Sequence, residues 1–328
     1  LDIDNGKCFI GLANSWVDSA GGSTGNPSTG ANPTFTFTAG TQMFYFLEVA
    51  GCIWAANFGQ RAFTNTAPSG YVALNTYNLP ASTISNGATV MAATTYTGTG
   101  SSLAITNTVS STSFKPDLVW IKSRSAATDN TVYDSVRGAQ SRLETNNTDA
   151  QVTSDGGLTS FDTSGFTVST LAQVNTNTAT YVAWQWQAGQ GTTSSNTSGS
   201  ITSTVSVNAT AGFSVVTYTG TGANATVGHG LGVTPSMYIV KRRTGGVGNW
   251  AVWHTGLSNT TTSYILLDST AAQSTSTSLW GSTAATSTTI GIGTSVTTNN
   301  STDTYVAYCW AAVKGFSDRK STRLNSSH

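Results

Sequence analysis

Hydrophobic residues alternate with polar ones in short runs along most of the chain, and Gly, Asn, Ser or Pro residues separate these runs. In the segment 181–186 (YVAWQW), Val182, Trp184 and Trp186 share one face of an extended chain, which favours a buried sheet face. No stretch keeps a 3.6-residue period long enough to predict a helix. Many short strands between turns predict an all-β protein with antiparallel β-sandwich or jelly-roll-like domains.

Two segments of more than a hundred residues repeat each other. Four landmarks recur at offsets between 119 and 124: TYTGTG at 95 and 217, PDLVWIK at 116 and PSMYIVK at 235, VYDS at 132 and VWHT at 252, and TYVAWQW at 180 and TYVAYCW at 304. Matched landmarks over this length predict a duplicated domain. We call residues 81–189 copy 1 and residues 203–317 copy 2.

Three further segments flank the copies. Residues 1–80 form a different N-terminal module, and residues 190–202 (QGTTSSNTSGSIT) are predicted to be a flexible Gly/Ser/Thr linker. The tail at 318–328 (DRKSTRLNSSH) resembles the translation of a sequencing adapter, so we expect it to be non-native and exclude it from the fold. We also expect the chain to be a fragment of a longer protein, cut at both ends.

The chain is poor in charge. Only 9% of residues are charged, against about 25% in ordinary domains, and 14 basic residues balance 14 acidic ones. Without the tail, 11 basic and 13 acidic residues remain, a formal charge of −2. A nucleic-acid partner is not expected because it requires a basic surface. No membrane insertion is expected, since no apolar run reaches the ~20 residues of a membrane helix.

The reactive side chains do not form a recognisable catalytic or metal motif. A glycosidase needs two carboxylates, and the acids of copy 1 are interpreted as solvated loop residues: Asp134, Glu144, Asp149, Asp155 and Asp162. His229 and His254 lack a third zinc ligand, and the sequence DIDNG at 2–6 fits a hairpin better than a calcium loop. The sequence therefore predicts no enzyme, no cofactor and no metal.

The cysteine and basic residues do not point to a functional site. Cys8, Cys52 and Cys309 are interpreted as free thiols, with a Cys8–Cys52 disulfide as the alternative. The basic cluster at 241–243 (KRR) is interpreted as a solvated strand end. Two tryptophans in polar surroundings are the candidate ligand contacts: Trp16 in NSWVDS and Trp280 in SLWGSTAAT.

Residues 1–80 resemble the C-terminal half of a SPRY domain, a concanavalin-like β-sandwich used for binding. The strings that carry this resemblance are LDIDNGKCFI (1–10), NPTFTF (32–37), MFYFLEV (43–49), WAANFGQRAF (54–63) and GYVALNTYNLP (70–80). The strands that open such a domain are absent from the sequence. The resemblance therefore implies a truncated sandwich with an exposed sheet edge.

The two copies resemble a repeat found in tail-associated and other virion proteins of bacteriophages. The matching strings include FKPDLVWIKSRS (114–125), LTSFDTSGFTV (158–168) and VGHGLGVTPSMYIVK (227–241). The resemblance implies a tail-fibre-like or decoration module in the virion that binds a host-surface glycan or protein, or other virion proteins. Homo-oligomers are common in such proteins. The alternative is the binding part of a secreted or cell-surface carbohydrate-active enzyme or adhesin, with its catalytic part outside this fragment.

Overall fold

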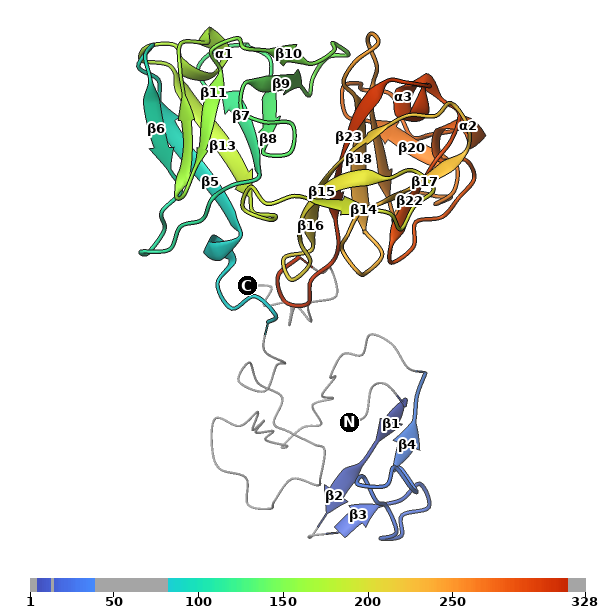
Figure 1. Ribbon diagram of the computed structural model, residues 1–328. Helices are drawn as coiled ribbons and strands as arrows, with labels where there is room; N and C mark the ends of the chain where they lie inside the picture. Colours follow the sequence, from blue (N-terminus) through green and yellow to red (C-terminus); the bar gives the residue numbers. More distant parts are fainter. Residues whose placement is uncertain (1–4, 13–14, 39–81, 318–328) are drawn as a thin grey trace. The chain divides into compact units, whose positions relative to one another are not determined.

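The computed structural model describes residues 5–12, 15–38 and 82–317 (Figure 1). The chain divides into two compact units, Leu1–Pro80 and Ala81–His328, each with its own sheets. Cys52, the adapter-like tail and the SPRY-like strings at 43–49, 54–63 and 70–80 lie outside the described residues.

The described part of the N-terminal unit contains two small antiparallel pairings. β1 (Lys7–Cys8) pairs with β4 (Phe35–Thr36), and β2 (Ile10–Leu12) pairs with β3 (Ser15–Val17). Thr34 connects the two pairings. Its backbone N–H donates to the Cys8 carbonyl of β1 at 2.9 Å, and its Oγ1 accepts from the Ile10 backbone N–H at 2.9 Å and donates to the Val17 carbonyl at 2.5 Å.

Copy 1 folds into two antiparallel sheets. Its elements are η2 (Gly87–Thr89), β5 (Met91–Thr97), β6 (Leu103–Thr106), β7 (Leu118–Ser123), β8 (Thr131–Asp134), β9 (Ser141–Glu144), β10 (Val152–Thr153), β11 (Leu158–Asp162), β12 (Gly165–Val168), α1 (Ala172–Asn175) and β13 (Thr180–Trp186). The larger sheet has the strand order β10-β9-β8-β7-β13-β5, and the smaller has the order β11-β12-β6.

Copy 2 has the same plan with a longer main sheet. Its elements are β14 (Ser194–Asn196), β15 (Ser203–Asn208), β16 (Phe213–Thr219), β17 (Ala225–Gly228), β18 (Met237–Arg242), β19 (Trp250–His254), β20 (Ser263–Leu266), β21 (Ser274–Thr275), α2 (Thr277–Trp280), β22 (Thr289–Ile292), α3 (Val296–Asn299) and β23 (Thr304–Trp310). The sheets have the orders β14-β15-β16-β23-β18-β19-β20-β21 and β17-β22.

The strand order of copy 1 recurs in copy 2, where β16-β23-β18-β19-β20-β21 repeats β5-β13-β7-β8-β9-β10. All pairs of named strands are antiparallel, and the helices of the described residues are single turns. The predicted all-β class with sandwich architecture is therefore confirmed. Within the described ranges, no helix has the length and apolarity needed to cross a bilayer.

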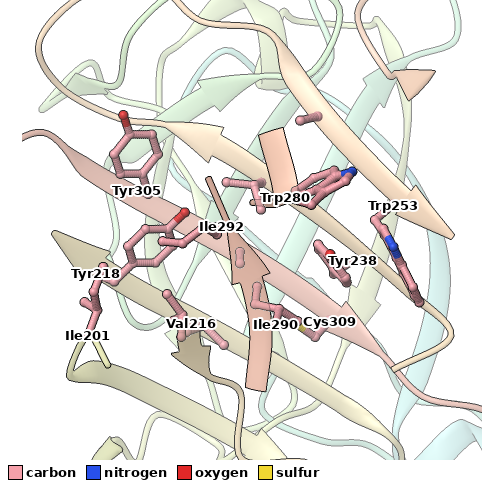
Figure 2. Close-up of a cluster of buried hydrophobic side chains, with 14 of the residues drawn as sticks. Ile201, Val216, Tyr218, Tyr238, Trp253, Trp280, Ile290, Ile292, Tyr305 and Cys309 are labelled. Carbon is pink, nitrogen blue, oxygen red and sulfur yellow. The ribbon is translucent and has the colours of Figure 1, made fainter. Parts of the chain in front are cut away.

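Each copy has a hydrophobic core between its two sheets. In copy 1, Val119 and Ile121 from β7 pack with Phe166 from β12. In copy 2, Tyr238 stacks on Trp253 with ring centroids 4.8 Å apart, and Trp280 meets Tyr238 edge to face at 5.1 Å (Figure 2). Large aromatic side chains therefore fill the space that the short strands of the smaller sheet leave.

A third hydrophobic cluster joins the two copies. Leu118, Val132 and Leu143 of copy 1 pack with residues of copy 2 that include Phe213 and Val252. The main sheets of both copies are thus covered on two faces. The face of β13 that carries Trp184 and Trp186 lies on this side, and both tryptophans are half-buried. Its predicted burial therefore comes in part from the second copy.

The segment 190–202, predicted to be a flexible linker, is instead part of the copy 2 sheet. β14 lies within it and pairs with β15. Its first residues are held by the fully buried Asp117 of copy 1, whose carboxylate accepts from the backbone N–H groups of Gln190 and Gly191, both at 2.7 Å. Ala188 N donates to the same carboxylate at 2.7 Å. A Gly/Ser-rich segment can be flexible or ordered. Here it is ordered by Asp117, which lies 71 or more residues earlier in the chain and is therefore not part of the local composition.

Candidate functional site

A groove of about 910 Å³ opens where β13 and β23 end, between the two copies. Six large apolar side chains line it: Met91, Trp186, Phe213, Met237, Trp310 and Phe316. No charged side chain lines it among the described residues. Its volume lies in the range of small-molecule sites, and its walls combine large apolar side chains with a few polar groups.

Trp186 and Trp310 occupy equivalent positions in the two copies and meet in this groove. Their ring centroids lie 6.0 Å apart with an interplanar angle of 73°, and the Trp310 ring lies 5.2 Å from the ring of Phe213. Both tryptophans are half-buried, whereas Phe213 is buried and its ring packs against both indole rings. The duplication therefore brings two indole rings together, one from each copy.

Ser236, His254, Thr255 and Ser317 supply the polar part of the lining. The Nδ1 atom of His254 accepts a hydrogen bond from the Gly256 backbone N–H at 2.8 Å. In the neutral ring the proton is therefore on Nε2, which makes this atom a donor. The groove therefore combines apolar ring faces with an imidazole and three hydroxyl groups.

The two tryptophans proposed from the sequence as ligand contacts lie elsewhere. Trp280 is fully buried in α2, and its Nε1 donates to the Ser263 carbonyl at 3.0 Å. The expected exposure of Trp280 is therefore wrong, because its ring fills the core of copy 2 beside Tyr238. Trp16 lies on β3 in the N-terminal unit and is half-buried, with its ring against Gly11. Neither side chain lines the groove.

The acids of copy 1 are more buried than the sequence predicted. Asp134 is fully buried, pairs with Arg137 Nε at 2.5 Å, and accepts from the Tyr308 hydroxyl of copy 2 at 2.7 Å. Glu144 and Asp155 both pair with Arg142, and their side chains are 12% and 11% exposed. For these three acids the interpretation as solvated loop residues is wrong, since each has a cationic partner in the packed interior.

The remaining acids differ. Asp149 is exposed. Asp162 accepts hydrogen bonds from Ser160 and Thr167, both at 2.7 Å. These contacts satisfy its carboxylate within copy 1.

The basic cluster at 241–243 is also not a solvated strand end. Lys241 is fully buried and donates to the Thr148 carbonyl of copy 1 at 2.9 Å. Arg242 pairs with Asp303, and Arg243 Nε donates to Gln151 Oε1 at 2.9 Å. The strand end is covered by copy 1, which the local sequence does not indicate.

The histidines and cysteines form no metal site in the part of the chain that the structure describes. His229 is fully buried, with its Nδ1 accepting from the Leu231 backbone N–H and its Nε2 3.2 Å from the Thr286 carbonyl. Across the described ranges, no group of three His, Cys, Asp or Glu side chains is placed to hold a metal ion. Cys8 and Cys309 are free, as predicted, and burial raises the pKa of Cys309 to about 12.

The groove residues were missed because they belong to different strands. Trp186 and Trp310 were identified as a repeated position, but the pattern placed them on a buried face. The signal that would have found the groove is their place at the last residue of equivalent strands, where a sheet face meets solvent.

The comparisons with known proteins identify a family and no characterised relative. No curated protein and no solved structure matches the chain. A family model described as "Domain of unknown function (DUF7483)" matches residues 86–328. The match spans both copies as one stretch and covers well over half of the chain, so the protein belongs to the DUF7483 family.

Proposed function

We propose that this protein is a non-enzymatic binding module of a bacteriophage virion and that its groove holds a neutral glycan of the host surface. The observation that carries the proposal is the pair of equivalent tryptophans, Trp186 and Trp310, in one uncharged groove. Indole faces stack on the C–H-rich faces of sugar rings, and Ser236 and Thr255 supply hydrogen-bonding groups for the sugar hydroxyls. The virion context rests on the resemblance of the two copies to tail-associated repeats.

The rest of the chain supports a rigid binding surface. The groove has walls from both copies, and these share a hydrophobic cluster and a buried Asp134–Arg137–Tyr308 network. A groove with fixed walls loses little conformational entropy when a ligand binds. The low charge of the chain, 9% of residues, fits a neutral ligand better than a charged one.

A glycan array probed with the full chain tests this function. We expect binding to neutral glycans, and Trp186→Ala and Trp310→Ala should each weaken it at least about tenfold, as expected for an aromatic at the centre of an interface. Trp184→Ala is the matched control, because Trp184 lies two residues away on the same strand but outside the groove lining. Absence of glycan binding together with specific association with another virion protein would overturn glycan recognition and leave a structural role.

A further inference from the structure

The inner face of the main sheet in copy 1 is polar at its β8–β9 end. Thr131 lies opposite Glu144 in the β8–β9 ladder, so these two side chains share one face. Because side chains alternate along a strand, Tyr133 and Arg142 lie on the same face. Copy 1 therefore has Thr131, Arg142 and Glu144, beside the aromatic Tyr133, where a sandwich normally has an apolar core.

Copy 2 has aliphatic or aromatic side chains at the same four positions. The equivalent ladder pairs Ala251 with Leu266, and the neighbouring positions on that face are Trp253 and Tyr264. Ala251 and Trp253 belong to the copy 2 core, together with Trp280. The fold thus does not require polar residues here, and their presence in copy 1 needs another reason.

Two carboxylates in this polar cluster share a single amide nitrogen. The Nε2 atom of Gln173, on α1, donates to Asp129 Oδ2 at 3.1 Å and to Glu144 Oε1 at 2.8 Å. Asn146 Nδ2 also donates to Asp129, at 2.7 Å. The amide nitrogen therefore lies between two negative charges, which is the place where a bound cation would be stabilised.

The charges around this point do not balance. Arg142 pairs with both Glu144 and Asp155 and is the only base among the ion pairs of the cluster in the described residues. With Asp129, the cluster contains three carboxylates and one guanidinium group, which leaves two negative charges. A divalent cation would neutralise them.

An independent observation is the concentration of unpaired buried oxygens. Eight buried side-chain oxygens of the described residues make no hydrogen bond of normal geometry, and six of them belong to residues 128–145 and Gln173. Thr131 is fully buried, and its hydroxyl group is among the six, on the face that carries Glu144. Gln173 Oε1 and Asn130 Oδ1 are also unpaired. Each such atom destabilises the folded chain by about 1–3 kcal/mol unless a ligand or water pairs with it.

We propose that this cluster is a Ca²⁺ site with Asp129, Glu144 and Gln173 as its protein ligands. Rotation of the Gln173 amide by half a turn exchanges Nε2 for Oε1, and it breaks only the two bonds to the carboxylates because Oε1 makes none. The cation then replaces both bonds. Asn130 Oδ1 and water complete the coordination. An oxygen-only donor set with irregular geometry suits Ca²⁺, whereas zinc requires nitrogen or sulfur ligands.

Calorimetric titration of the metal-free full chain with CaCl₂ tests the site. We expect one Ca²⁺ per chain with a Kd of about 10⁻⁴ to 10⁻³ M, in the range of extracellular calcium modules. Asp129→Asn and Glu144→Gln should each weaken binding at least tenfold. The matched control is Asp162→Asn, since this carboxylate of the same copy is bonded to Ser160 and Thr167 and not to the cluster; its affinity should not change.

Two further measurements keep the test decisive if an acidic variant fails to fold. Gln173→Ala leaves both carboxylates in place and should lower the affinity severalfold. On the unaltered chain, Tb³⁺ luminescence excited through aromatic side chains should appear on binding near Tyr133 and be displaced by Ca²⁺. No heat and no displaceable luminescence at 5–10 times the upper Kd of about 10⁻³ M would overturn the proposal. Equal binding by the Asp129→Asn variant, or an equal loss in the Asp162→Asn variant, would overturn it as well.

Discussion

Asn175 and Asn299 hold equivalent loops in the two copies with the same three hydrogen bonds. Asn175 Oδ1 accepts from the Thr99 backbone N–H at 2.8 Å, and its Nδ2 donates to two carbonyl groups, at 2.5 and 2.6 Å. Asn299 accepts from Thr221 N at 2.8 Å and donates to two carbonyls, at 2.5 and 2.8 Å. The repeated TYTGTG string is therefore a structural motif, whose second half is the loop that this amide holds.

Asn299→Ala should lower the free energy of unfolding by about 3 kcal/mol. The substitution leaves one N–H and two carbonyl groups without a partner at a fully buried position. Urea unfolding followed by tryptophan fluorescence measures the loss. Asn224→Ala, at an exposed position in the same loop, should change stability by less than about 0.5 kcal/mol. A loss of less than about 1 kcal/mol for Asn299→Ala would contradict this role.

Trp280→Ala should be among the most destabilising single substitutions in copy 2. The ring is fully buried, packs edge to face on Tyr238, and donates a hydrogen bond to Ser263. Truncation of a buried tryptophan costs about 3–5 kcal/mol. Trp280→Phe retains most of the packing and should cost less. Thermal unfolding by circular dichroism measures both, and a near-neutral Trp280→Ala variant would contradict the core position.

Lys241 should make stability rise with pH above 8. Burial lowers its pKa to about 8 from 10.5, although Asp268 and Asp149 raise it. Between pH 8 and 10.5 the folded chain releases a proton that the unfolded chain keeps, so the folded state becomes relatively more stable as the pH rises. The gain should reach about 2 kcal/mol at pH 9.5.

The measurement is the difference in unfolding free energy between the unaltered chain and Lys241→Met from pH 7 to 9.5. Buried tyrosines and Cys309, whose pKa values are raised by burial, lower the stability of both proteins in alkali and cancel in this difference. A difference that stays constant with pH would show that Lys241 keeps its proton in the folded chain.

His229 should make stability fall as the pH drops below 6.5. Burial lowers its pKa, and the hydrogen bond of its Nε2 to the Thr286 carbonyl only partly offsets this. Below pH 6.5 the unfolded chain therefore binds a proton that the folded chain resists. In His229→Gln the decline between pH 6.5 and 5 should be shallower, as chemical denaturation at each pH would show. Equal slopes in the two proteins would contradict the prediction.

Much of the fold follows from the period of two and the internal repeat. Residues 181–186 and their equivalents were predicted to form strands, and β13 and β23 are those strands. The alternation of residues could not show that the two main sheets pack against each other. It separates the two faces of each strand, but it does not indicate what covers the face that points away from the core of its own copy. The segment 190–202 was misinterpreted for a related reason, since its acceptor Asp117 lies in a different part of the sequence.

The groove was harder to predict than the strands. Trp280 was expected at the surface because its neighbours are Ser, Thr and Gly, whereas its burial depends on Tyr238, 42 residues earlier. Trp186 and Trp310 become groove residues only once the two copies are packed. Local composition predicts neither outcome, because both result from contacts between distant strands.

The carboxylate of Asp117 also has a consequence for how such chains can be recombined. It lies in copy 1, yet its partners include Gly191, at the start of the segment that joins the copy 2 sheet, and Ser206, within that sheet. If the two repeats were separated, copy 1 would keep the buried Asp117 carboxylate without these partners. Both copies would also expose the hydrophobic residues that now pack between them. The smallest piece that can be exchanged between genes is therefore the pair, although each repeat alone has the length of an ordinary domain.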